Sequence, residues 1–247
     1  MSVGRAVDDA DRAKLLATLT QWAAARSFLA LRTRALILLA WGSALRLSET
    51  LKLDLDQVLE DPTLRKLGRI RSTAYVRGEQ AKGRRKGPRR WESAGAFIIT
   101  KPARAALRDY LIECVRRGWL TLPAPKGTPL FLTIKGRVGR GERVQRGRLG
   151  KRAAQHSFTS LQKRARISDP YRYHDLRHDA LTRLGDASNG NPFKVAQFGR
   201  LKDIRTAQRY VHGSIATLAE LAELASQPPK GRRSHAHRTS DPEPPAP

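Results

Sequence analysis

The chain has 247 residues, enough to bury a hydrophobic core as one large domain or two small ones. Lysine and arginine number 48 against 22 acidic residues, and the net charge of +26 favours a polyanion such as nucleic acid as the partner, because basic side chains release its condensed counterions. The single cysteine, Cys114, excludes an internal disulfide framework and indicates a reducing compartment. The N-terminus lacks the apolar core of a signal peptide, and the longest apolar run, 35–45, is too short to span a bilayer, so we expect a cytoplasmic protein with no membrane partner.

The first half of the sequence favours helices and then changes character. Residues 1–8 are expected to form a flexible N-terminus. The spacing of apolar residues predicts a helix over 9–26, a nearly all-apolar and therefore buried helix over 30–45, and a short helix over 47–53. Between 68 and 100, short β-favouring runs flank a basic segment that contains glycine, which predicts a small antiparallel sheet.

The second half returns to helices. Pro102 suits the first turn of a helix over 102–117, and a short strand at 130–132 and a long basic loop at 135–151 follow. The remaining helices are expected at 152–166, 174–185, 192–199, 203–211 and 214–226. The proline-rich polar tail, 227–247, is expected to be disordered. We therefore predict a mainly α fold with a small antiparallel β-sheet (α+β), with one folded domain over 9–226.

A histidine and an arginine in the predicted helix 174–185 form a candidate site. His174 and Arg177 lie three residues apart, so their side chains share one face of the helix. The planar arginine fork can grip two phosphate oxygens, and histidine exchanges a proton near neutral pH. The pair therefore suits a phosphodiester, although a His-x-x-Arg pattern is common on helices and is weak alone.

Tyr210 lies within reach of this pair, near the end of the segment DIRTAQRYVH. An isolated tyrosine is usually a core or interface residue, so its neighbours decide how it is interpreted. Nearby cations favour phenolate over phenol, which makes the hydroxyl a candidate nucleophile. The expected neighbours are Arg205, Arg209 and His212.

Arg46 follows the buried apolar helix, and Glu49 lies three residues further on. An isolated buried charge is costly, so the arginine needs a partner. One interpretation is a structural ion pair between the two residues, and the other is a cationic group held in a binding site.

A basic turn occupies residues 80–90 (QAKGRRKGPRR), between predicted strands. Such a hairpin tip either lies along DNA phosphates or is simply a solvated run of charge. The basic side chains in it are Lys82, Arg84, Arg85, Lys86, Arg89 and Arg90.

Motifs for metals and nucleotides are missing from the sequence. It contains no phosphate-binding glycine loop that ends in Gly-Lys-Ser/Thr, no His-Glu-x-x-His and no cysteine pair spaced for zinc. Acidic clusters of the kind that hold two magnesium ions are also lacking. We therefore expect no metal, no cofactor and a metal-independent mechanism.

Taken in order, these four features resemble the tyrosine recombinase (phage integrase) family over residues 9–212. The first arginine box of the family is resembled by the segment ALILLAWGSALRLSETLKLDLDQV, and its lysine hairpin by QAKGRRKG. Its second box is resembled by YRYHDLRH, and its nucleophile box by FGRLKDIRTAQRYVH. The resemblance implies a catalytic domain that cleaves and rejoins DNA strands at specific sites through a 3′-phosphotyrosyl intermediate, without metal or ATP. It also implies duplex DNA as the partner, a location at the nucleoid, and a homo-oligomer, a tetramer, on DNA.

The resemblance assigns a role to each matched residue. Arg46 and Arg177 would clamp the scissile phosphate, with Glu49 supporting the first box. His174 would act as acid or base on the nucleophile or stabilise the transition state, and Tyr210 would attack phosphorus.

The lysine of the hairpin would protonate the leaving 5′-hydroxyl. Lys82 stands in an Ala-Lys-Gly context like that of the family, and Lys86 in the same turn is the alternative. The four arginines of this turn, Arg84, Arg85, Arg89 and Arg90, are candidate DNA contacts.

The chain departs from the family pattern nine residues before the nucleophile, where histidine or tryptophan is usual and Leu201 stands here, preceded by Arg200. Either Arg200 substitutes after a one-residue shift, or Leu201 only packs against Tyr210. Loss of one donor of such a site can cost on the order of 2.7–4 kcal/mol of transition-state stabilisation. The alternative function is therefore a catalytically impaired DNA-binding or regulatory relative, and a basic RNA-binding protein would leave the order of the boxes unexplained.

The sequence begins almost at the catalytic domain, so we expect the usual N-terminal core-binding domain of the family to be missing. Either the high positive charge offsets this loss, because each phosphate contact adds affinity, or an accessory subunit supplies the missing half. The helix expected at 214–226 either packs on its own domain or docks on a neighbouring protomer.

Overall fold

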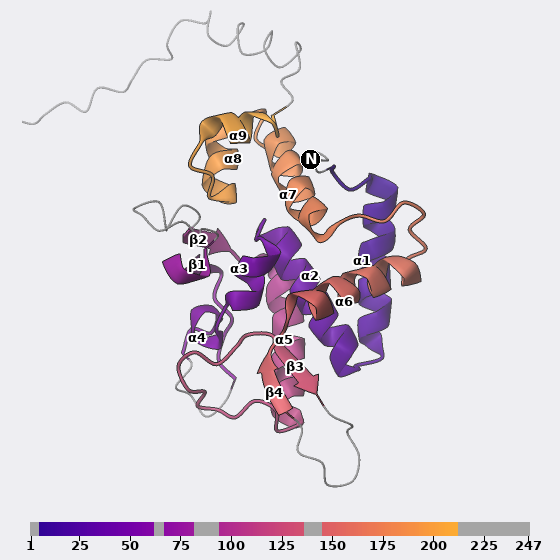
Figure 1. Cartoon of the computed structure of the whole chain (residues 1–247), viewed down its shortest axis with the longest axis vertical. Helices are drawn as coiled ribbons and strands as arrows, with labels where there is room; N and C mark the ends of the chain where they lie inside the picture. The colour runs from indigo at the N-terminus through magenta and orange to yellow at the C-terminus, as the bar shows by residue number, and fades with distance from the viewer. Residues whose placement is uncertain (1–4, 62–66, 82–93, 136–144, 212–247) are drawn as a thin grey trace, which may run out of the picture. The chain divides into compact units, whose positions relative to one another are not determined.

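Helices make up most of the structure, a computed structural model that describes residues 5–61, 67–81, 94–135 and 145–211 (Figure 1). The helices are α1 (Asp9–Ala24), α2 (Phe28–Gly42), α3 (Leu47–Lys52), α4 (Leu55–Val58), η1 (Gly78–Gln80, a 3-10 turn), α5 (Lys101–Arg116), α6 (Lys151–Arg164), α7 (Tyr173–Ala187), α8 (Pro192–Gly199) and α9 (Ile204–Gln208). The strands are β1 (Thr73–Val76), β2 (Gly95–Ile98), β3 (Leu132–Lys135) and β4 (Gln145–Arg148). The predicted mainly α fold with a small antiparallel sheet is confirmed. None of the described helices is both long and apolar enough to cross a membrane.

Helix α2 lies between the two larger clusters of buried apolar side chains. It begins at Ser27, whose Oγ accepts a hydrogen bond from the Ala30 backbone N–H at 3.3 Å. Its side chains are apolar nearly all round, as expected for a helix that is covered on every side. Leu36 packs into a cluster with α5 and the β1–β2 pair, whereas Ile37 packs into a cluster with α1, α6 and α7.

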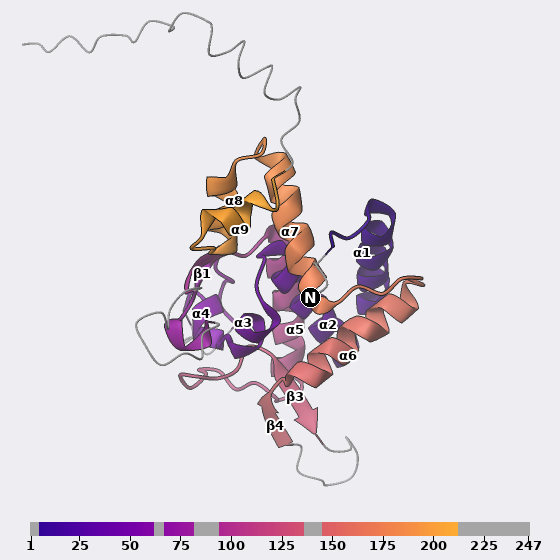
Figure 2. The same ribbon diagram turned by 45° about the horizontal axis from the view of Figure 1, so that its top comes forward.

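A third, smaller cluster holds the C-terminal elements together. Ala44, Leu181, Val195 and Ala207 are buried in it, and they come from the α2–α3 connection and from α7, α8 and α9. Helices α8 and α9 lie side by side next to α7 in both views (Figures 1 and 2). This packing brings the segment after α9 close to α7, although α8 and α9 lie between them in the sequence.

The strands differ from the prediction in number and extent. β1 and β2 pair antiparallel as expected, but Ile70 forms a separate bridge with Leu59. The strand expected at 130–132 begins at its last residue, because the Leu130 N–H donates to the Leu53 carbonyl at 3.0 Å and not to β4. The expected loop 135–151 is wrong in part: β4 pairs antiparallel with β3 there, so the described residues form two small sheets.

The boundaries of the predicted helices are shifted by up to three residues, as at the ends of α2 (Gly42) and α9 (Gln208). Helix α4 and the turn η1 were not anticipated, because each is only about one turn long. The helix expected at 214–226 and the tail 227–247 lie outside the described residues.

Part of the segment that was expected to be a flexible N-terminus is packed. Val7 is buried, and Arg5 stacks over the Tyr171 ring at 4.3 Å from its centroid. Asp8 caps α1 by accepting a hydrogen bond from the Ala10 N–H at 2.9 Å. The local sequence gives no sign of this packing, because the partners come from the other end of the chain.

A single carboxylate on α7 ties this N-terminal segment, α1 and α2 together. Asp179 is fully buried and accepts hydrogen bonds from the Val7 backbone N–H at 3.1 Å, Arg12 Nη1 at 2.7 Å, Trp41 Nε1 at 2.6 Å and Arg183 Nε at 3.0 Å. A buried carboxylate with four donors is well compensated. It therefore fixes the position of α7 against the helices that precede it.

We expect Asp179→Ala to lower the free energy of unfolding by about 3–5 kcal/mol, because it leaves the buried donors without their acceptor. Urea denaturation measures the change. Asp186→Ala is the matched control, since Asp186 is exposed on the same helix and surface changes usually stay within about 0.5 kcal/mol. Equal stability of the two variants would show that the Asp179 contacts contribute little.

Candidate active site

The site is built around Glu49, which lies in the first turn of α3 and is fully buried. Arg46, the residue that caps this helix, donates its backbone N–H to Glu49 Oε2 at 3.0 Å and its Nη1 to Oε1 at 2.7 Å. The two residues thus form the ion pair that their spacing suggested. Burial alone would raise the pKa of Glu49, but the charges of Arg46 and Arg200 outweigh it and the pKa is lowered, so Glu49 is ionised at neutral pH.

Arg200 is the second guanidinium on this carboxylate. Its Nη2 donates to Glu49 Oε2 at 3.0 Å, and the residue is only 8% exposed. Its Nε and Nη1 are buried and have no hydrogen-bond partner among the described residues. Burial lowers the pKa of Arg200. Arg200 adopts a left-handed backbone conformation (φ 51°) directly after α8, which costs a residue with a side chain about 1 kcal/mol or more.

Arg177 reaches the same place from α7. It is 3% exposed and donates to the backbone carbonyls of Ala44 and Gly199, the latter at 2.6 Å from Nη2. It forms no ion pair with a carboxylate of the described residues, and burial, followed by the charge of Arg46, lowers the pKa of Arg177 to about 9. The Ala44 carbonyl also lies 3.4 Å from Arg200 Nη2. Two buried guanidinium groups therefore share one carbonyl oxygen.

His174 lies one helical turn before Arg177, as the spacing predicted, and is exposed. Partial loss of hydration lowers its pKa, and the positive charges of Arg177 and Arg46 act in the same direction. The imidazole is therefore neutral at pH 7 and can accept a proton.

Tyr210 follows α9 and is partly buried. Its ring packs edge-on against His178, with the ring centroids 4.8 Å apart and the planes at 64°. It also interacts electrostatically with Arg177, whose pKa it raises slightly against the larger effect of burial. The structure thus brings together Arg46, Arg177 and Tyr210, three residues that lie far apart in the sequence.

A glycine of α7 allows Tyr210 this position. A Cβ atom on Gly185 would stand 2.0 Å from the Tyr210 carbonyl oxygen and 3.1 Å from its carbonyl carbon. Only a residue without a side chain lets the two backbones approach so closely. Sequence reasoning missed Gly185, although a glycine inside a helical pattern can mark a close approach. The carbonyls of Ala44 and Gly199 were missed as well, because a backbone acceptor leaves no trace in the sequence.

The other residues that were predicted around the tyrosine differ in their surroundings. Arg205 and Arg209 are exposed. Leu201 and Tyr210 both pack against the small apolar cluster that contains Leu181 and Val195. His212 lies outside the described residues.

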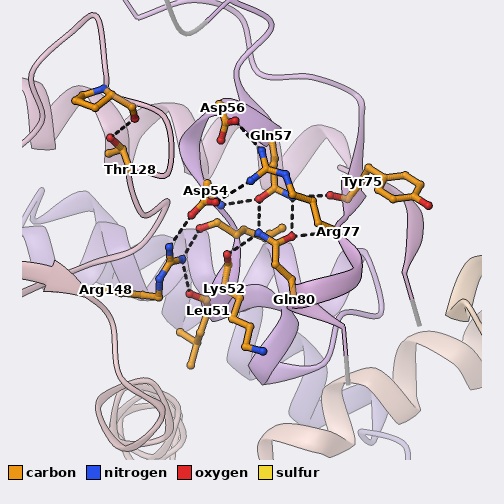
Figure 3. A network of polar contacts seen from close by, with 12 residues as sticks. Leu51, Lys52, Asp54, Asp56, Gln57, Tyr75, Arg77, Gln80, Thr128 and Arg148 are labelled. Atoms are coloured by element: carbon orange, nitrogen blue, oxygen red, sulfur yellow. Dashed lines mark hydrogen bonds and ion pairs between the residues drawn. The ribbon is translucent and has the colours of Figure 1, made fainter. Parts of the chain in front are cut away.

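Residues 82–90 of the basic turn also lie outside the described residues, with the predicted Lys82, Lys86, Arg84, Arg85, Arg89 and Arg90. The residue that leads into it is held firmly, however (Figure 3). Gln80 is buried, and its side-chain amide exchanges hydrogen bonds with that of Gln57 at 2.7 and 2.8 Å and donates to the Lys52 carbonyl at 2.8 Å. Because Lys52 ends α3, this network attaches the start of the turn to the helix that carries Glu49.

Within the part of the chain that the structure describes, no three or more histidine, cysteine, aspartate or glutamate side chains gather in a way that could hold a metal ion. What gathers instead is positive charge. Three guanidinium groups and one carboxylate meet beside a neutral imidazole and a phenol. Such a set can bind and orient an oxyanion and can supply a nucleophilic hydroxyl.

We expect Gly185→Ala to lower the free energy of unfolding by about 1–3 kcal/mol, because the new methyl group forces the Tyr210 backbone away from α7. Helix propensity alone predicts the opposite sign, a gain of about 0.5–1 kcal/mol. Urea denaturation distinguishes the two. Gly147→Ala serves as the control, since the nearest atom to a Cβ there is 3.8 Å away. A Gly185→Ala protein more stable than wild type would contradict the close approach.

The sequence matches the Phage integrase family over residues 8–216. No curated protein sequence gives a significant match to this chain. The chain is similar in fold to a solved XerA recombinase (18% identity, TM-score 0.56, 91% of this chain and 64% of that chain). It is also similar to XerH site-specific recombinase bound to difH substrate in a pre-cleavage complex (15% identity, TM-score 0.57, 92% of this chain and 56% of that chain). A third similar structure is the Tn1549 transposon integrase in complex with transposon right end DNA (17% identity, TM-score 0.59, 92% of this chain and 68% of that chain).

These identities are low, so the solved structures by themselves show a shared fold. The chain spans only 53–64% of the length of the Xer structures. The family model itself matches every described residue from Asp8 onward, including all the elements that build the site. The chain therefore belongs to the phage integrase family, the tyrosine recombinases.

Proposed function

We propose that this chain is a site-specific DNA recombinase or integrase that cleaves and rejoins DNA strands through Tyr210. The observation that carries the proposal is the excess of positive charge at the site, where Arg46, Arg177 and Arg200 meet a single carboxylate, Glu49. A phosphodiester would supply the missing negative charge and the oxygen acceptors. The similar XerH and Tn1549 integrase structures contain DNA, which agrees with duplex DNA as the partner here.

In the proposed reaction the Tyr210 oxygen attacks the scissile phosphorus. A bond forms between them, the bond to the 5′-oxygen of the next nucleotide breaks, and the chain is left with a 3′-phosphotyrosyl link. Neutral His174 accepts the phenol proton, directly or through water, and Lys82 gives a proton to the leaving 5′-oxygen, which becomes a 5′-hydroxyl. The reverse attack by a 5′-hydroxyl rejoins a strand, and because the covalent link conserves the bond energy, no ATP is consumed.

The guanidinium groups have a separate task in this mechanism. Arg46 and Arg177 would bind the non-bridging oxygens and stabilise the charge that grows on them in the transition state. Because Arg46 is tied to Glu49, and Arg177 to two carbonyls, they are oriented before substrate arrives. Such preorganisation contributes more than flexible surface cations could.

We further propose that Arg200, rather than Leu201, takes the place of the usual histidine or tryptophan. Support comes from the position of Arg200 beside Glu49, where its Nε and Nη1 have no hydrogen-bond partner among the described residues, and from the apolar surroundings of Leu201. The second candidate function is a DNA-binding relative with impaired catalysis. The observation in its favour is that Arg200 is buried and already bound to Glu49, which limits its reach towards a substrate.

The direct test is a nicked suicide DNA substrate, from which the cleaved strand cannot be rejoined. Candidate sites are inverted repeats in the DNA that flanks the gene. We expect wild-type protein to form a covalent adduct with the DNA and Tyr210→Phe to form none, because the phenylalanine ring has no attacking oxygen. Denaturing gel electrophoresis detects the adduct.

Tyr75→Phe is the matched control, because Tyr75 is an exposed tyrosine of β1 and should keep full adduct formation. A wild-type protein that binds the site in a salt-sensitive manner but forms no adduct would favour the impaired relative. An adduct that persists in Tyr210→Phe would assign the nucleophile to another residue.

A second pair of variants decides between Arg200 and Leu201. We expect Arg200→Met to slow adduct formation by roughly 10²- to 10³-fold, the usual effect of removing one donor to a developing oxyanion. Leu201→His should bring no gain, because position 201 lies in the apolar cluster. Faster cleavage by Leu201→His, together with unchanged cleavage by Arg200→Met, would reverse the assignment. Binding of the DNA site, measured in parallel, separates effects on catalysis from effects on affinity.

A further inference from the structure

A basic cavity lies apart from the Tyr210 site and is formed by other helices and strands. A cavity of about 960 Å³ opens between the beginning of α2, the β3–β4 pair and the first two turns of α6. Its lining includes four side chains that can carry positive charge and no carboxylate. The four are Arg32, Arg148, Arg152 and His156.

Arg32 is the unusual member of this set, because it is only 8% exposed and yet has no ion pair with a carboxylate of the described residues. Its Nη1 donates to the Leu132 carbonyl at 3.0 Å, and its guanidinium carbon lies 5.2 Å from the centroid of the Phe28 ring. Its Nε is buried and finds no hydrogen-bond partner in the described part of the chain. Burial lowers its pKa. A buried cation without a counter-ion is costly, so an occupant that supplies negative charge would be stabilising.

Arg177 offers a direct comparison. Within the described residues, Arg177 and Arg32 are alike in being almost fully buried and bonded to backbone carbonyls alone, whereas Arg200 has Glu49. Arg177 belongs to the proposed phosphate site. The same arrangement at Arg32 indicates a second place where the protein leaves a guanidinium ready for an anion.

The N-terminus of α6 adds to the positive character of the cavity. Gly150 caps this 14-residue helix and has no side chain to accept from its free N–H groups. The first turn contains no acidic residue, and Lys151 and Arg152 stand there instead, against the usual preference for negative charge at this end. A bound anion would satisfy the N–H groups and reverse the unfavourable electrostatics.

One wall of the cavity is fixed by the network beside α3 (Figure 3). Arg148 donates to the carbonyls of Leu51 and Leu53, both at 3.0 Å, and to Asp54 Oδ1 at 2.6 Å. Its charge is therefore compensated, and it serves to hold β4 in place. Arg152 and His156 are exposed on α6 and remain available to an incoming ligand.

We propose that this cavity binds a phosphate group, distinct from the one at Tyr210. Arg32 forms its buried base, the first turn of α6 supplies N–H groups, and Arg152 and His156 flank its opening. The phosphate belongs either to the backbone of bound DNA, away from the cleaved bond, or to a free phosphate compound. Only the first source rests on the proposed recombinase function.

The test uses the full chain with the single change Arg32→Met, which removes the charge and keeps an apolar side chain of similar length. Inorganic phosphate is titrated calorimetrically at fixed ionic strength, so that diffuse binding to the basic surface is constant. We expect the number of phosphate sites to fall by one in Arg32→Met. Arg34→Met is the matched control, because Arg34 lies on the same helix, pairs with Asp109 at 3.0 Å and does not line the cavity.

A second measurement separates the two sources of phosphate. If the site takes a backbone phosphate, the slope of log Kd for a DNA duplex against log salt concentration should be smaller by about 0.9 in Arg32→Met than in wild type. A site that takes a free phosphate compound leaves this slope unchanged while the phosphate stoichiometry still falls. An unchanged stoichiometry in a folded Arg32→Met protein overturns the proposal from either source.

If Arg32→Met fails to fold, Arg152→Ala gives the same readout from an exposed position. It should weaken phosphate binding at this site several-fold without removing the site, and unaltered binding would count against the proposal. The phosphate titration involves no DNA cleavage. Its outcome is therefore independent of whether Tyr210 forms an adduct.

Discussion

The site depends on one fully buried carboxylate. Glu49 has no contact with water, so its charge must be balanced inside the protein, and Arg46 and Arg200 do this from two sides. The arrangement joins the start of α3 to the end of α8, which are 151 residues apart in the chain. If the carboxylate were removed, two guanidinium groups would repel each other in a poorly hydrated place. The ion pair that looked like a local structural feature therefore holds the geometry of the whole site.

The backbone conformation also helps to shape the site. Ala44 and Arg200 both adopt left-handed conformations that are unfavourable for residues with a side chain. These turns lie next to the carbonyls of Ala44 and Gly199 that accept from Arg177. Strain of this kind persists only where surrounding contacts hold it. Here the buried arginines provide those contacts.

Helix α7 connects the site to the rest of the molecule. It carries His174 and Arg177 at one end, Asp179 in the middle and Gly185 near the other end. Asp179 attaches it to α1 and α2, and Gly185 lets the tyrosine segment lie directly against it. The positive charge of the chain is thus not only a surface property. Among the described residues, part of it is buried without a carboxylate partner, at Arg177 and again at Arg32, and phosphate oxygens would complement it there.

The sequence by itself determined the features that arise from neighbouring residues. Apolar spacing set the main helices, the three-residue spacings set the Arg46–Glu49 pair and the shared face of His174 and Arg177, and the order of four motifs identified the family. Only the tertiary structure decided that β4 pairs with β3, that Val7 is buried and that Arg200 rather than Leu201 lies beside Glu49. It also decided how closely Gly185 approaches Tyr210. The physical reason is that propensity, capping and side-chain periodicity act within a few residues, whereas these contacts join segments far apart and depend on how the buried charges and apolar faces pack together.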